Sequence, residues 1–241
     1  MTSVENRGDT RGRFRRALGL GAFGAIALCS GQSLAGPLTV GAGLIGAAGG
    51  NFQSKPDLVG AEPDVNPGFG GLTIGGGFLL DARLFNLVGL EVDIIRSSDH
   101  GTGSVTFNGF KNDVTIGQGA WHFPILAKVT FPSPLIAPEV FIGPEIVSPS
   151  KASVSVDPST FAGAFAQTAD TYVMLTFGGG IEIKLPLPIL DLRIPITVRG
   201  SYAPGVSSKF ADRTPTVFPV VTYRSEWQYA VNGTLGAALY F

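Results

Sequence analysis

Apolar and polar side chains alternate residue by residue along several segments of this chain. In residues 87–95 the apolar members share one face of an extended backbone, namely Val88, Leu90, Val92 and Ile94. The same alternation recurs in residues 172–185, 190–202 and 225–241. Successive side chains of a β-strand point to opposite faces, so this pattern predicts strands with one apolar and one polar face.

Weaker alternation adds candidate strands at residues 38–50, 68–85, 118–131 and 136–148, which makes eight in all. The connections alternate in length: Asn86, 132–135 and 186–188 are short, whereas 51–67, 99–117, 149–170 and 203–224 are long. No stretch of the chain after residue 35 has the roughly 20 apolar residues of a membrane helix. We therefore predict an all-β fold, an eight-stranded antiparallel up-and-down transmembrane β-barrel with short periplasmic turns and long external loops.

Aromatic residues fall at the two ends of the predicted strands. Trp121, Tyr202, Trp227 and Tyr229 lie at outer ends, and Phe131 and Phe241 lie at inner ends. Such girdles are typical of barrels that cross a bilayer. The strands of a soluble β-sandwich would also alternate apolar and polar side chains, but a sandwich would not need aromatic residues sorted by strand end.

The first segment is typical of a secretory signal peptide. Basic residues precede a short apolar run at 17–28, namely Arg7, Arg11, Arg13, Arg15 and Arg16. The small residues Ser33 and Ala35 fit cleavage after Ala35. We expect residues 1–35 to be a cleaved signal peptide and residues 36–241 to be the barrel, exported to the outer membrane of a Gram-negative bacterium. Cys29, the only cysteine, lies in the leader, so the mature chain has no thiol for a disulfide or a metal.

Composition narrows the functional classes further. Only 15% of the residues are charged, and the chain has 34 glycines and 17 prolines, which is unusual for a soluble enzyme. Without the leader, acidic residues outnumber basic ones. We therefore expect no nucleic-acid partner.

The polar strand faces would place eight acids, five bases and one histidine in the lumen. They are Asp81, Arg83, Glu91, Asp93, His122, Lys128, Glu139, Glu145, Glu182, Lys184, Asp191, Arg193, Arg199 and Glu226. Side chains can fill a barrel of this size, so buried charges are expected to pair. We predict a structural salt-bridge plug. The alternative is a narrow polar pore, for which Gly75, Gly77, Gly178 and Gly180 would leave space.

Catalytic chemistry has few candidates in the sequence. His122 is interpreted as a lumen residue with satisfied hydrogen bonds. His100 follows Ser97, Ser98 and Asp99, which are the residue types of an acyl hydrolase or transferase. Neighbours on a strand point to opposite faces, however, so closeness in sequence does not assemble a site. We expect no enzyme, no catalytic residue, no cofactor and no metal site.

Four prolines lie inside predicted strands: Pro124, Pro138, Pro144 and Pro195. Each one removes a donor from the hydrogen-bond ladder, and proline in a sheet is normally confined to bulges, edges or strand starts. We expect bulges at these positions, or strand boundaries that differ from those predicted.

The segment WHFPILAKVTFP (121–132) is followed after a short turn by APEVFIGPEIV (137–147). Together they resemble the PorT-like family of outer-membrane β-barrel domains, in which a strand with a Pro-Leu-Leu-Lys-like core precedes a strand with a Gly-Pro pair. The matching residues are Pro124, Ile125, Leu126, Ala127, Lys128, Gly143 and Pro144. The resemblance covers the middle third of the chain and implies a small outer-membrane barrel.

The chain ends in Phe241, with Leu235 and Leu239 behind it. This ending is similar to the recognition signal of barrels delivered by the outer-membrane assembly machinery. We therefore expect two partners, the lipid of the outer membrane and the barrel assembly machinery.

The leading functional hypothesis is a non-enzymatic integral outer-membrane protein with a structural or surface-binding role through its external loops. Loops of this length are long enough to carry a binding surface for an external ligand, whose identity the sequence does not give. The first alternative is a small pore or transport channel. The second is a lipid A-modifying acyl hydrolase or transferase.

Overall fold

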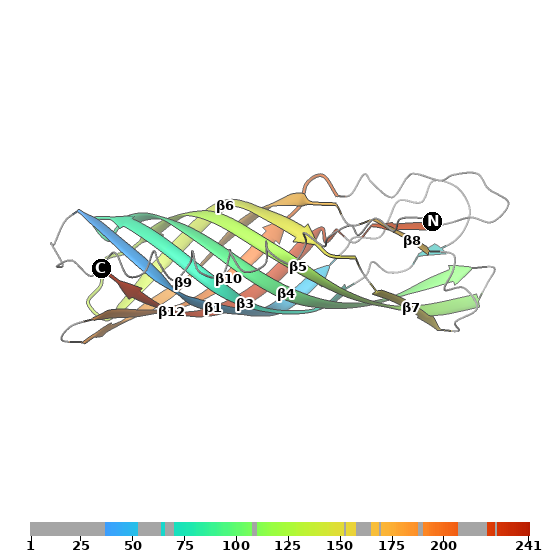
Figure 1. The fold of residues 1–241 in the computed structure, drawn as a ribbon, viewed down its shortest axis with the longest axis horizontal. Helices are drawn as coiled ribbons and strands as arrows, with labels where there is room; N and C mark the ends of the chain where they lie inside the picture. Colours follow the sequence, from blue (N-terminus) through green and yellow to red (C-terminus); the bar gives the residue numbers. More distant parts are fainter. Residues whose placement is uncertain are drawn as a thin grey trace, which may run out of the picture. The chain divides into compact units, whose positions relative to one another are not determined.

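The computed structural model describes residues 37–52, 64–65, 70–107, 110–151, 153–157, 165–168, 170–187, 190–206, 221–224 and 226–241. The expected signal peptide and parts of the long connections lie outside these residues. Eight long strands form a closed barrel (Figure 1). They are β1 (Leu38–Phe52), β3 (Gly70–Leu84), β4 (Val88–Phe107), β5 (Phe110–Thr130), β6 (Ile136–Pro149), β9 (Tyr172–Pro186), β10 (Asp191–Tyr202) and β12 (Tyr229–Tyr240).

Each of these strands pairs antiparallel with the next one along the chain, and β12 returns to pair with β1. The closing pair runs from Gly41↔Tyr240 to Phe52↔Tyr229. The predicted eight-stranded antiparallel up-and-down barrel is therefore confirmed. No helix among the described residues is both long and apolar enough to cross a bilayer.

Four shorter strands lie in the connections: β2 (Asp64–Val65), β7 (Ser153–Asp157), β8 (Phe165–Thr168) and β11 (Val221–Arg224). β2 pairs with β4, and β8 pairs with β11 in a separate parallel sheet. β7 continues along β5 where β6 ends, with the register moved by one residue. At this shift the Ser150 backbone N–H and hydroxyl both donate to the Gly119 carbonyl, each at 2.7 Å.

The prediction of a long loop at 99–117 is wrong. β4 continues to Phe107 and β5 begins at Phe110, and these two residues pair in one long hairpin. The sequence between them is Asn108-Gly109, which is a strong hairpin signal. The partner β3 pairs with β4 only as far as Thr102, so the hairpin runs beyond its neighbour.

The expectation of bulges at the prolines is wrong, since the registers of the paired strands stay constant, although β5 begins before the predicted residue 118. The ladder instead omits pairs locally beside Pro124, Pro144 and Pro195. Between β5 and β6, for example, pairing stops after Pro124↔Glu145 and resumes in the same register at Ala127↔Ile142. A missing N–H removes only its own hydrogen bond, and the intact pairs on both sides hold the strands together. Pro138 lies near the start of β6.

The barrel is apolar outside and polar inside. Leu44, Phe78 and Val198 face outward and are 62%, 62% and 61% exposed, whereas Asp93 and Glu182 face inward and are 0% exposed. A soluble domain has the opposite arrangement. An apolar exterior with every barrel strand paired on both sides suits the hydrocarbon of a bilayer.

Four of the six predicted girdle residues lie on or near the outer face. Trp121, Phe131 and Tyr229 are 43% to 52% exposed, and Tyr202 stacks on Tyr229 with ring centroids 5.2 Å apart. The C-terminal Phe241 is 48% exposed. Leu235 of the terminal motif also faces outward, at 58% exposed, and Leu239 is half-buried.

Trp227 contradicts the girdle prediction, because it is only 3% exposed. β12 begins at Tyr229, so the alternation that governs this strand does not extend back to Trp227. Its backbone N–H donates to the Tyr172 hydroxyl at 3.2 Å. Its ring occupies the space that Gly101 leaves open, where an added Cβ would lie 2.7 Å from the indole.

Candidate functional site

The lumen near the short turns holds a continuous set of buried ion pairs, the lumen ion network. Its members come from six strands: Asp81, Arg83, Glu91, Asp93, Lys128, Glu139, Glu182, Arg193 and Arg199. All are 5% exposed or less. Acids and bases alternate through it, so the charges largely compensate one another.

Arg83 is the centre of the network. Its guanidinium donates to Asp81 at 2.5 Å and to Glu182 at 2.5 and 3.0 Å. It also donates to the hydroxyl of Tyr240 at 2.8 Å, and that hydroxyl donates to Asp81 at 2.8 Å. Arg193 contacts Glu182 at 3.5 Å, and its guanidinium lies 3.9 Å from the centre of the Tyr240 ring.

Lys128 and Arg199 extend the network. The Lys128 ammonium binds Glu91, and it lies 3.3 Å from Asp81 and 3.4 Å from Glu139. Arg199 donates to Glu91 at 2.8 Å and to Asp93 at 2.5 Å.

Two of these contacts cross the lumen. Arg83 on β3 reaches Glu182 on β9, and Arg199 on β10 reaches β4. In the closed strand order, β9 lies opposite β3 and β10 lies opposite β4. The ion pairs therefore span the lumen as well as lining it.

The remaining predicted lumen residues lie elsewhere. Lys184 is half-buried and donates to the Ser133 carbonyl at 3.1 Å, and the Asp191 side chain is 45% exposed beside Arg193. Glu226 is 1% exposed and precedes β12. The lumen charges thus differ in depth, which sequence alternation alone cannot distinguish.

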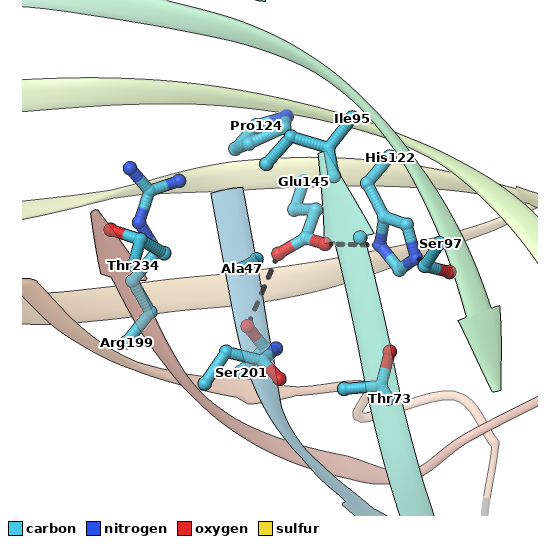
Figure 2. Close-up of a pocket in the computed structure, with 12 residues that line it drawn as sticks. Ala47, Thr73, Ile95, Ser97, His122, Pro124, Glu145, Arg199, Ser201 and Thr234 are labelled. Atoms are coloured by element: carbon cyan, nitrogen blue, oxygen red, sulfur yellow. Dashed lines mark hydrogen bonds and ion pairs between the residues drawn. The ribbon is translucent and has the colours of Figure 1, made fainter. Parts of the chain in front are cut away.

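A small pocket follows the ion network toward the long connections (Figure 2). Its lining includes Ser97, His122, Glu145, Arg199 and Asn232. The cavity measures about 30 Å³ and is only partly enclosed, which leaves room for about two water molecules.

Three of these side chains form a hydrogen-bonded relay, the Ser97–His122–Glu145 triad. The Ser97 Oγ lies 2.9 Å from His122 Nε2, and His122 Nδ1 lies 2.7 Å from Glu145 Oε1. An ionised carboxylate only accepts hydrogen bonds, so Nδ1 carries the proton and Nε2 accepts from the Ser97 hydroxyl. Figure 2 shows Glu145 between His122 and Ser201.

The second carboxylate oxygen of Glu145 is also held in place. Thr176 donates to Oε2 at 2.5 Å, and Ser201 donates to it at 3.1 Å. Both oxygens therefore have donors, and the ring of His122 is fixed from the Nδ1 side. Such support orients an imidazole toward a hydroxyl.

The sequence candidates for a catalytic group are separated by the strand geometry. Ser97 and Asp99 are buried in the lumen, whereas Ser98 and His100 are exposed on the outer face. Asp99 accepts from Thr73 at 2.5 Å. The histidine that meets Ser97 is His122 of the next strand, so the predicted grouping around His100 does not assemble.

An apolar cluster lies beyond the triad, toward the long connections. It comprises Ala120, Val147, Tyr172, Met174, Ala203, Val206 and Ala230. Ala120 on β5 and Val147 on β6 lie two positions from His122 and Glu145 on the same strand face. Met174 on β9 lies two positions from Thr176, which donates to Glu145. The pocket therefore lies between charged and apolar layers. In the described part of the chain, no group of three or more His, Cys, Asp or Glu residues could hold a metal ion.

A closed barrel with an apolar exterior and an ion-paired interior defines the class: the chain is an integral outer-membrane β-barrel protein. No protein-family model matches the chain, and no curated protein matches it.

Two solved outer-membrane proteins are similar to this chain. The outer membrane protein OprG from Pseudomonas aeruginosa is 8% identical with a TM-score of 0.42, over 85% of this chain and 95% of that one. Ail, the attachment invasion locus protein of Yersinia pestis, is 12% identical with a TM-score of 0.34, over 86% of this chain and 99% of that one. No activity of this chain follows from similarity at this level.

Proposed function

We propose that this protein is a non-conducting barrel in the outer membrane of a Gram-negative bacterium. Its role is structural or surface-binding, through the segments at its long-connection end. The observation that carries the proposal is the pair of contacts across the lumen from Arg83 and Arg199. A lumen filled by paired side chains has no continuous water path for ions.

The long hairpin of β4 and β5 supports the surface-binding part of the proposal. Its backbone pairing continues to Phe107↔Phe110, past the last β3 pair at Gly70↔Thr102. A paired hairpin presents a more ordered surface than a loop of the same length, which lowers the entropy lost on binding.

The proposal includes the route by which the protein reaches its site. A cleaved signal peptide at residues 1–35 would direct export. The outward-facing Leu235 of the last strand and the C-terminal Phe241, which is 48% exposed, would be presented to the assembly machinery. Membership in the PorT-like family is part of the same proposal, and it rests on the sequence segments 121–132 and 137–147.

Planar-bilayer recordings test the closed lumen. The purified protein should give no stepwise conductance under conditions in which an open porin in the same bilayer does. Discrete openings of the wild-type protein would contradict the proposal and favour the pore alternative. Heat-modifiability on a gel establishes that the protein is folded in each preparation.

Surface labelling tests the orientation of the barrel. Single cysteines at Thr102 and Pro134, in a Cys29→Ser background, lie at opposite ends, and both positions are exposed. In intact cells a membrane-impermeant maleimide should label Thr102→Cys only. Labelling of Pro134→Cys alone would show that the short turns face the outside of the cell and that the β4–β5 hairpin does not.

A further inference from the structure

We infer that Ser97 is a base-activated nucleophile and that the pocket around it hydrolyses esters with short acyl chains. This inference does not depend on the proposed function. It departs from the sequence-based expectation of a non-enzymatic barrel, because the contacts that carry it join three different strands. Ser97 lies on β4, His122 on β5 and Glu145 on β6.

The atoms of the triad meet in the order that nucleophilic catalysis requires. The carboxylate binds Nδ1 at 2.7 Å, and Nε2 faces the hydroxyl at 2.9 Å. Both distances are within hydrogen-bond reach. The pairing is not a by-product of one local motif, since the two hydrogen bonds join residues 25 and 23 positions apart in the sequence.

The surroundings of the triad favour a reactive arrangement over a filled plug. Ser97 and His122 both line a cavity that is only partly enclosed, although Ser97 itself is only 7% exposed. The His122 side chain is 15% exposed, whereas the ion network beneath is almost wholly buried. The lining residue Asn232 has a side-chain amide of the type that can donate to an oxyanion.

The cavity size selects the substrate class. About 30 Å³ is room for about two water molecules, so the cavity favours the smallest acyl groups over a fatty acyl chain. The inference is thus restricted to small esters and differs from lipid A deacylation.

The reaction proceeds in two balanced steps. The Ser97 oxygen bonds to the carbonyl carbon while His122 Nε2 takes the hydroxyl proton. The bond from the carbonyl carbon to the alkoxy oxygen breaks, and the leaving alcohol takes the proton from Nε2. Water then attacks the acyl-Ser97 ester with His122 as base, which releases the carboxylic acid and restores the serine.

The test uses the purified full barrel in detergent with p-nitrophenyl acetate as the probe. The wild-type protein should release p-nitrophenol about a hundredfold faster than Ser97→Ala or His122→Gln, in line with the usual size of a general-base contribution. Mass spectrometry of the quenched wild-type reaction should find the acetyl group on Ser97.

Ser98→Ala is the matched control, because Ser98 is the next residue and faces outward. It should hydrolyse the probe at the wild-type rate. The heat-dependent gel shift establishes that each variant is folded, and Ser97→Cys provides a second variant that keeps a nucleophile at the site. Wild-type hydrolysis no faster than Ser97→Ala, or acetylation at other residues only, would overturn the inference.

Discussion

Replacement of Lys128 by methionine is the sharpest test of the lumen ion network. Lys128 is 1% exposed, and its ammonium is surrounded by Glu91, Asp81 and Glu139. Methionine keeps most of the side-chain volume and removes the charge, so the variant isolates electrostatics from packing.

The expected magnitude follows from the geometry. At an effective dielectric constant of about 20, a unit charge pair at 3.3 or 3.4 Å attracts by about 5 kcal/mol. Desolvation of the ammonium offsets much of this attraction. Removing one member of a buried pair lowers the free energy of unfolding by about 3–5 kcal/mol, because the acids then stay buried without compensation.

Equilibrium unfolding in urea, in lipid vesicles, measures the effect. Lys184→Met is the matched control, since Lys184 is half-buried and its hydrogen bond goes to the Ser133 carbonyl at the turn. It should change the free energy of unfolding by about 1 kcal/mol or less. A loss below about 1 kcal/mol in Lys128→Met would show that water compensates these acids, and the closed-lumen argument would fail with it.

Two further predictions concern the outer face and the long-connection end. Leu44→Arg places a charge on the lipid-facing side of β1 and should lower the free energy of unfolding in vesicles by about 2–4 kcal/mol, whereas Leu44→Ile should change it by about 0.5 kcal/mol. Equal stability of the two variants would mean that this face does not contact hydrocarbon. Gly101→Val should displace the Trp227 ring, whose nearest atom would lie 2.7 Å from the new Cβ. The Trp227 fluorescence should then shift to longer wavelength. An unchanged spectrum would show that the Trp227 ring does not pack against Gly101.

The fold was predictable from the sequence because its signal is local. The alternation of apolar and polar side chains is visible within a single strand, and the length of each connection is visible in the segment between two strands. They gave the strand number, the antiparallel order and the apolar outer face. The same local logic fails at Trp227, where the strand has not yet begun, and at 99–117, where the polar composition predicts a loop although Asn108-Gly109 is a hairpin signal.

The candidate site was much less predictable, because strand register decides which lumen residues meet. The alternation predicts that His122 and Glu145 face the lumen and groups Ser97 with the polar residues before His100, but no sequence pattern links the three across β4, β5 and β6. The nearer histidine, His100, was the more obvious partner for Ser97 in sequence. Backbone pairing brings His122 level with Ile95, close enough for its ring to reach Ser97.

The lumen ion network also has a consequence for how the barrel is assembled. Its hydrogen bonds, together with the one from Tyr240 to Asp81, join residues 99, 106 and 159 positions apart, so they form only when β3 and β4 face β9, β10 and β12. A hairpin inserted alone would carry unpaired charges into the bilayer, which is strongly unfavourable. Closure and charge pairing are thus one cooperative event, and contacts so distant in sequence make that event slow. A half-length fragment should not remain in the membrane as a stable subdomain.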